Sequence, residues 1–117
     1  MILLYTNWGS LGSRRAKTYF SENNKKFVEK NIQKFKLTEE ELKYILSKCE
    51  NGTEDIISTR SKVYKNMKGD LNDLTTTELI QLIQDHPNIL RLPVILSDQM
   101  MFAGWDDEEV ELASRMA

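Results

Sequence analysis

The sequence has almost none of the residues that form covalent or metal cross-links. Its 117 residues include one cysteine, Cys49, and one histidine, His86. A single cysteine excludes an internal disulfide and any Cys-x-x-Cys pair. No set of His, Cys, Asp and Glu residues has metal-ligand spacing, and no loop matches a P-loop or dinucleotide-binding motif. We therefore expect neither a metal nor a cofactor.

The low content of proline and glycine and the lack of long apolar runs indicate a folded protein that does not span a membrane. There are only two Pro and five Gly, whereas apolar residues make up 40% and charged residues 29% of the chain. This composition is typical of a folded protein rather than a disordered one. No apolar run is long enough to span a bilayer, and the N-terminal run is too short for a signal peptide. We expect a single domain over residues 1–117, located in the cytoplasm, and the net charge of −2 excludes a global basic field for nucleic acid.

The N-terminal third has a strand-helix-strand pattern. Residues 2–6 form an apolar run that predicts a buried strand. A helix is predicted over residues 11–23, because Ala16 and Phe20 recur at helical spacing on one face. Residues 27–32 predict a second strand. A connection through one helix makes these two strands parallel.

The middle of the chain is predicted to be helical. Three helix starts carry an acceptor residue followed three positions later by Glu, the pattern of a capping box. A further short helix is predicted over residues 58–67, beginning at Ser58. The three capping pairs are Thr38 with Glu41, Thr75 with Glu78, and Asp106 with Glu109.

The last strands are predicted to form a hairpin. Residues 92–96 are rich in β-forming side chains, residues 97–99 form a turn, and residues 100–103 are the partner strand. The whole order predicts an α/β fold with a mixed four-stranded sheet. A helical insertion over about residues 33–90 separates the two halves of that sheet.

The first loop has the layout of an anion-binding or reactive site. In "YTNWGSLGSRRAK" (5–17), an apolar strand leads through a glycine-containing loop into a basic helix. Ser10 and Ser13 lie where a nucleophile would, but an unassisted serine is a poor one, and nothing in the sequence places His86 beside Ser10. Helix N-capping by these serines and anion binding by the helix N–H groups with Arg14 both remain open.

Three other positions have structural interpretations. Gly52 follows the helix that starts at Thr38, and we expect it to end that helix with positive φ, assisted by Asn51. Cys49 falls on the apolar stripe of the same helix, which predicts a small buried hydrophobe. We expect Trp8 to cover the first helix.

Taken together, several segments resemble the Spx and arsenate-reductase-like (ArsC) family, and within it the Spx transcriptional regulators most. The resemblance covers about residues 2–110 and implies a thioredoxin-like fold with a helical insertion. It also implies a cis peptide bond at Pro93. The segments are "YT…SRRAK", "FVEKNI", "NGTEDIISTRSKVYK", "LIQDHPNILRLPVIL" and "GWDDEEV".

The resemblance to Spx proteins implies a function without catalysis. Proteins of this kind bind the C-terminal domain of the RNA polymerase α subunit, and they do so through a surface around the position of Gly52. We therefore expect a transcription regulator with a protein partner, without sequence-specific DNA binding and without membrane association. The partner-binding residues implied are Glu50, Asn51, Gly52, Thr53, Arg60 and Lys62.

The chain departs from that family at its redox motif. Where Spx proteins have Cys-x-x-Cys, this chain has Ser10-Leu11-Gly12-Ser13, and hydroxyls cannot form a disulfide. Thiol sensing and arsenate reduction by this loop are therefore not expected. The alternative function is a degenerate arsenate-reductase-like protein that retains an oxyanion pocket, although Arg60 can equally pack at the surface of its own helix. The pocket would be formed by Ser13, Arg14, Arg60 and Arg91, with Arg91 expected beside Ser10.

Overall fold

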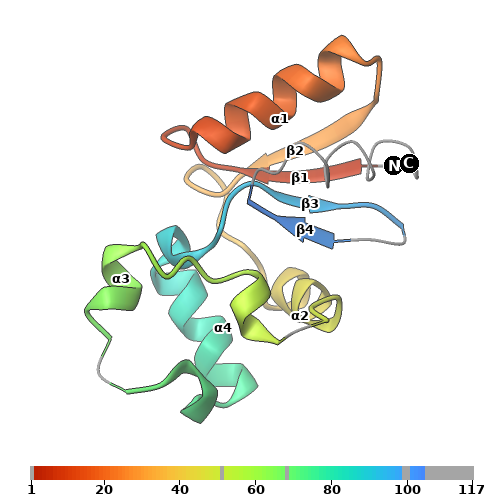
Figure 1. The fold of residues 1–117 in the computed structure, drawn as a ribbon. Coiled ribbons are helices and arrows are strands. Elements are labelled where there is room, and N and C mark those ends of the chain that lie inside the picture. Colours follow the sequence, from red (N-terminus) through yellow and green to blue (C-terminus); the bar gives the residue numbers. More distant parts are fainter. Residues whose placement is uncertain (1, 51, 68, 99–100, 105–117) are drawn as a thin grey trace. The chain divides into compact units, whose positions relative to one another are not determined.

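The computed structural model describes residues 2–50, 52–67, 69–98 and 101–104. Contacts divide the chain into two compact units, one built from the residues up to Phe35 and from Leu92 onward, the other from Lys36–Arg91. The described α-helices and strands (Figure 1) are, in chain order, β1 (Ile2–Thr6), α1 (Leu11–Glu22), β2 (Phe27–Asn31), α2 (Glu39–Ser47), α3 (Lys62–Lys65), α4 (Thr76–Asp85), β3 (Val94–Leu96) and β4 (Met101–Ala103).

The first unit contains the predicted mixed sheet, with strand order β2-β1-β3-β4. β1 and β2 are parallel, with Ile2 opposite Phe27 and Thr6 opposite Asn31. β3 is antiparallel to both β1 and β4. The two strand pairings predicted from the sequence, parallel for the first two strands and antiparallel for the hairpin, are confirmed. Because β1 and β2 are parallel, the loops that follow them leave from the same edge of the sheet.

α1 lies along one face of this sheet (Figure 1) and supplies its core. The buried cluster joins Ala16 and Phe20 of α1 to Ile2, Leu4 and Ile95 of the sheet. Phe20 is fully buried, and its ring packs edge-on against Tyr19 at 5.7 Å and tilted against Phe27 at 6.1 Å. The helical face predicted from sequence spacing is therefore the face that carries the core.

The second unit begins two of its helices with the predicted capping boxes. Thr38 Oγ1 accepts from the Glu41 N–H at 3.1 Å, and Glu41 Oε1 accepts from the Thr38 N–H at 3.0 Å. Thr75 and Glu78 make the same reciprocal pair at 3.1 and 3.0 Å. Each box satisfies two backbone donors that the helix leaves unpaired. The third predicted box, at Asp106, lies outside the described residues.

The start of the helix predicted at Ser58 is wrong. α3 begins three residues later, with Ser61 as its N-cap, whose Oγ accepts from the Tyr64 N–H at 3.1 Å. The Ser58 N–H instead donates to the Ile89 carbonyl at 2.7 Å, beside an isolated bridge between Ile57 and Leu90. A backbone pairing with a segment about thirty positions away thus holds Ser58 outside the helix.

The boundaries of the second unit match the predicted helical insertion to within three residues. Its core is a set of buried aliphatic side chains, among them Leu42, Ile45, Ile56, Ile83 and Ile89. No helix in the described ranges combines the length and apolar character that a membrane crossing requires. That the two units fold as one domain stays a prediction.

Candidate functional site

The first corner, residues Thr6–Ser13, joins β1 to α1 and contains both candidate serines. Ser10 is the N-cap of α1, with extended backbone, and its Oγ accepts from the Ser13 N–H at 3.1 Å. The Ser10 N–H donates to the Asn7 carbonyl at 3.0 Å. Of the alternatives left open by the sequence, N-capping is therefore the role that the geometry gives to Ser10.

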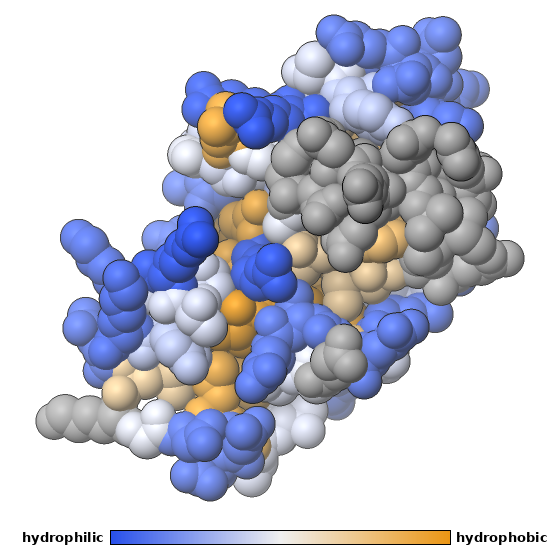
Figure 2. All heavy atoms as spheres, viewed as in Figure 1, coloured by the Kyte–Doolittle hydropathy of each residue, from blue (hydrophilic) through white to orange (hydrophobic). Residues whose placement is uncertain are grey.

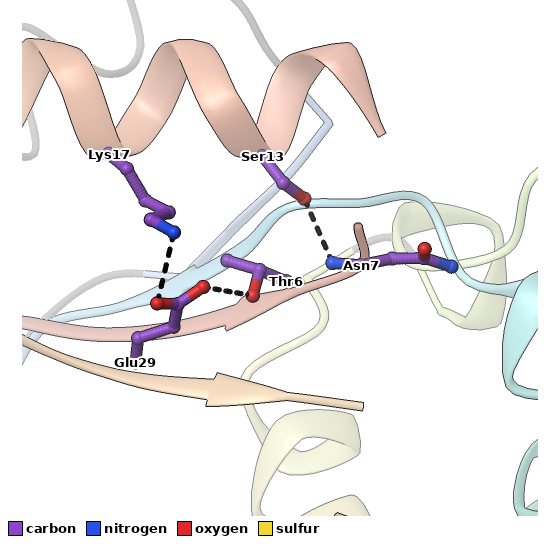
Figure 3. Close-up of polar contacts among 5 residues, drawn as sticks. All are labelled: Thr6, Asn7, Ser13, Lys17 and Glu29. Atoms are coloured by element: carbon purple, nitrogen blue, oxygen red, sulfur yellow. Dashed lines mark hydrogen bonds and ion pairs between the residues drawn. The ribbon is translucent and has the colours of Figure 1, made fainter. Parts of the chain in front are cut away.

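Ser13 has a different role, so the interpretation of both serines as caps is wrong for this residue. It lies inside the first turn of α1, is 1% exposed, and its Oγ accepts from the Asn7 N–H at 3.2 Å (Figure 3). Ser13 thus ties the start of the helix to the loop before it. The hydrogen bonds described for the two hydroxyls come from backbone donors, the Ser13 N–H to Ser10 Oγ and the Asn7 N–H to Ser13 Oγ.

A polar brace that the sequence did not predict lies behind this corner. Thr6, 2% exposed, donates from Oγ1 to Glu29 Oε2 at 2.5 Å, and Lys17 Nζ lies 3.2 Å from Glu29 Oε1 (Figure 3). The brace links β1, β2 and α1 through one carboxylate. The hint in the sequence was the alternation of side chains along a strand. Thr6 lies opposite Asn31, and Glu29, two positions before Asn31, points to the same face of the sheet as Thr6.

The helix start leaves donors for an anion. By helix geometry, the N–H groups of Leu11 and Gly12 have no intrahelical partner, and no hydrogen bond to either is present among the described residues. Arg14 is exposed one turn along. Of the predicted oxyanion pocket, Ser13 and Arg14 lie in this first unit.

Trp8 does not cover the first helix, contrary to the sequence-based expectation. Trp8 is 67% exposed, and its main-chain N–H donates to Gln33 Oε1 at 3.1 Å. The main-chain bond holds the loop to the segment after β2, and the indole is left in solvent. The apolar face of α1 is not available to receive it, because Ala16 and Phe20 are buried against the sheet, while Leu11 at the helix start is itself 55% exposed.

The predicted partner-binding surface belongs to the second unit. We call it the Gly52 surface and define it as Glu50, Gly52, Thr53, Arg60 and Lys62. Asn51, also predicted, lies outside the described residues. Gly52 has positive φ, +82° with ψ −161°, but the expectation that it ends α2 is wrong. α2 ends at Ser47, and Gly52 instead precedes a short 3₁₀ turn, its carbonyl accepting from the Asp55 N–H at 3.2 Å. A Cβ at Gly52 would meet nothing within 4 Å, so the position faces open space.

The two arginines of the predicted oxyanion site also lie in the second unit. Arg60 is exposed in the turn before α3, not on the helix itself. Arg91 is exposed, and its main-chain N–H donates to the main-chain carbonyl of Ile56 at 2.7 Å. A pocket assembled from both units, with Arg91 beside Ser10, stays a prediction.

Comparisons with known proteins now decide the family. The model of the ArsC family matches residues 10–113, which is most of the chain. The chain belongs to the ArsC family. As the resemblance noted in the sequence implied, its relatives include Spx proteins. It is 39% identical to the "Global transcriptional regulator Spx" of Streptococcus pneumoniae R6, over 94% of this chain and 83% of that protein. It is 40% identical to "Global transcriptional regulator Spx 1" of Lactococcus lactis IL1403, over 94% and 86%.

Solved structures agree on the fold. The arsenate reductase from Vibrio cholerae superimposes with a TM-score of 0.82 at 18% identity, covering 95% of both chains. The ArsC-family chain described here is thus an α/β protein of thioredoxin-like fold. The Leu92–Pro93 peptide bond is cis, and it immediately precedes β3, which begins at Val94 rather than at the predicted residue 92.

Cys49, the only thiol of this ArsC-family chain, is half-buried two residues after the end of α2. Its Sγ lies 3.5 Å from the Ile45 carbonyl. Burial, with a smaller contribution from the negative charge of Asp55, raises the pKa of the thiol from 9.0 to about 11. The thiolate is therefore scarce at neutral pH, and Cys49 is a poor substitute for the missing redox pair.

This shift predicts slow alkylation of the folded protein. At pH 8 we expect iodoacetamide to modify Cys49 about 100-fold more slowly in the native chain than in urea, because two pKa units lower the thiolate fraction by that factor. The rate should rise as the pH approaches 11. By linkage, the stability that the neutral thiol contributes is present below pH 9 and is lost as the pH rises through 11. Asp55→Asn should speed the native reaction only slightly; equal native and unfolded rates would contradict the assignment.

Proposed function

We propose that this chain is a Spx-like transcription regulator that binds the C-terminal domain of the RNA polymerase α subunit through the Gly52 surface. The observation that carries the proposal is 39–40% identity to named Spx regulators over 94% of the chain. Such identity over nearly the whole length includes both units. The regulator would act by occupying the polymerase domain, without turning over a substrate.

Local geometry supports the Gly52 surface as the point of contact. Gly52 is exposed and has a backbone conformation that is essentially restricted to glycine. A residue without a side chain lets a partner backbone approach closely. A small hollow of about 60 Å³ adjoins it, with Thr53, Glu54 and Tyr64 in its wall, so the surface is contoured enough to seat a side chain.

Redox-independent action is the second part of the proposal. The Spx-type disulfide needs two sulfurs, and Ser10 and Ser13 supply hydroxyls that are engaged in holding the helix start. The remaining thiol, Cys49, lies in the other unit and has a raised pKa. Binding to the polymerase domain should therefore be the same in dithiothreitol and in diamide.

A pull-down with the isolated polymerase domain tests the proposal. We expect Gly52→Arg to weaken binding at least tenfold, because the added side chain extends into the space that the partner backbone must enter. Gly52→Ala has the same positive-φ strain without the bulk and should retain most of the binding. Gly9→Arg places the same charge on the first unit, where a Cβ has only an ordinary contact, and should bind like wild type. Absence of binding by every protein, wild type included, ends the proposal.

The oxyanion pocket is a second candidate function. It is favoured by the donors at Leu11 and Gly12 and by exposed arginines in each unit, since guanidinium groups suit tetrahedral anions. Calorimetric titration with arsenate, phosphate and sulfate separates the two functions. A saturable site lost in Arg91→Ala supports an anion pocket, whereas a pure docking protein shows only the heat of dilution.

A further inference from the structure

The first unit carries a strongly uneven charge that the proposed function does not use. Residues 2–35 contain seven Lys and Arg against two acids, whereas residues 36–91 contain eight against ten. One of the two acids, Glu29, is already paired with Lys17 at 3.2 Å. The positive charge is therefore local to the segment from β1 to β2, within a chain of net charge −2.

The exposed side of α1 concentrates this charge. α1 buries Ser13, Ala16 and Phe20, which leaves its opposite side to solvent. We call the exposed residues Arg14, Arg15, Thr18 and Ser21, with Lys26 in the turn beyond the helix, the α1 basic face. The exposed Glu22 lies on the same side of α1, so the three cations leave a net charge of +2 there. The α1 region at the top of the view is mainly hydrophilic (Figure 2). Within the described ranges, none of these cations is ion-paired.

The composition of the α1 basic face fits phosphate groups rather than carboxylates. Arg14, Thr18 and Ser21 lie at i, i+4 and i+7, so they form one line along the helix. One guanidinium is followed there by two hydroxyl groups, with Arg15 beside the line, and both kinds of group bind phosphate oxygens in protein–DNA complexes. From Arg14 to Ser21 this line extends about 10 Å, enough to reach two or three successive phosphates of one strand, which rise about 3.4 Å each along the DNA axis.

We infer that the α1 basic face contacts the phosphate backbone of duplex DNA, without reading its sequence. The inference rests on the proposed function for its biological setting, because a protein held on RNA polymerase lies close to promoter DNA. With a net charge of −2 the free chain has little long-range attraction, so the contact is weak alone. It becomes effective when docking raises the local concentration of DNA.

The test measures DNA binding by the full chain without polymerase. Anisotropy of a fluorescent 30-bp duplex of arbitrary sequence is followed from 25 to 150 mM salt. We expect a Kd on the order of 10⁻⁴ M at low salt, as for non-specific binding. Arg14→Glu with Arg15→Glu should weaken binding at least tenfold and reduce the slope of log K against log salt by about 2, since each lost phosphate contact removes about 1.

Matched controls exclude a general charge effect. Lys43→Glu with Lys48→Glu on the second unit changes the net charge equally and should weaken binding no more than about twofold. Thr18→Val with Ser21→Ala should weaken binding about threefold with the salt slope unchanged, because uncharged donors release no counterions. If the doubly reversed protein fails the circular-dichroism check for folding, Arg14→Gln with Arg15→Gln replaces it.

Three outcomes overturn the inference: equal losses in the two charge-reversed proteins, an unchanged salt slope, or displacement by polyglutamate as effective as by unlabelled DNA. The polymerase pull-down with Arg14→Glu and Arg15→Glu keeps the two proposals separate. The variant should still be captured. For the wild-type chain, capture of the polymerase domain without any DNA binding refutes only the inference. DNA binding without capture refutes only the docking proposal.

Discussion

Phe20→Ala is expected to lower the free energy of unfolding by about 3–5 kcal/mol, the largest effect of any single truncation in the first unit. Phe20 is 0% exposed and lies at the centre of the cluster formed with Leu4 and Ile95. Its ring also contacts those of Tyr19 and Phe27. Truncation removes these contacts together and leaves a cavity between helix and sheet.

Urea denaturation monitored by circular dichroism measures this effect. Thr18→Ala, an exposed change on the same helix, is the control and should stay within about 0.5 kcal/mol of wild type. Phe20→Leu should lie between the two, because it keeps most of the buried volume. A loss below 1 kcal/mol for Phe20→Ala would mean that α1 does not anchor the sheet as described.

Ile83→Ala is expected to cost about 2–5 kcal/mol and to loosen both units together. Ile83 is 0% exposed in α4, within the core of Lys36–Arg91. The chain passes between the units twice, after Phe35 and before Leu92, so an unfolded insert becomes a long loop between β2 and β3 and adds its closure entropy to the cost of pairing β3 with β1. Chains of this length usually unfold in one cooperative step.

Hydrogen exchange distinguishes one domain from two. In Ile83→Ala, amides of β1 and β3 should lose protection by the same free energy as those of α4. Gln81→Ala, exposed on the same helix, is the control and should leave all three elements unchanged. If α4 alone loses protection, the two units open independently and the single-domain prediction is wrong.

Local signals predicted most of the first unit and the starts of two helices. The apolar run at residues 2–6 and the spacing of Ala16 and Phe20 depend only on neighbours along the chain, and the structure has both elements. The capping boxes at Thr38 and Thr75 are likewise local, because the acceptor and the Glu are three residues apart.

Errors arose where a distant segment decides the outcome. Ser58 and Ser61 are equally good N-caps by sequence. A hydrogen bond from the Ser58 N–H to the Ile89 carbonyl holds Ser58 outside the helix, so Ser61 is the N-cap. Gly52 was expected to end α2, but four residues separate it from the last residue of that helix. Its positive φ occurs at the start of the 3₁₀ turn that follows it. The polar brace depends on the β1–β2 register, which the sequence predicts only as a pairing and not by residue.

The candidate site was predictable in part for a different reason. Ser10 could be assigned as a cap because N-capping is a local geometry. The roles of Arg60 and Arg91 depend on how distant segments come together, and no pattern of spacing encodes that arrangement. The family, in contrast, was recognisable from motifs spread along the chain, and the matching family model confirms it.

The position of β2 at the edge of the sheet has a consequence for self-association. An edge strand presents unpaired backbone groups on which a second chain can extend the sheet, and Val28 on β2 is 50% exposed. Val28 is followed directly by Glu29 and Lys30, one on each face of the strand, so an incoming strand would place its side chains beside a charged group on either face. We therefore expect the carboxylate of Glu29, which braces the first corner, also to disfavour the addition of a second chain to this edge.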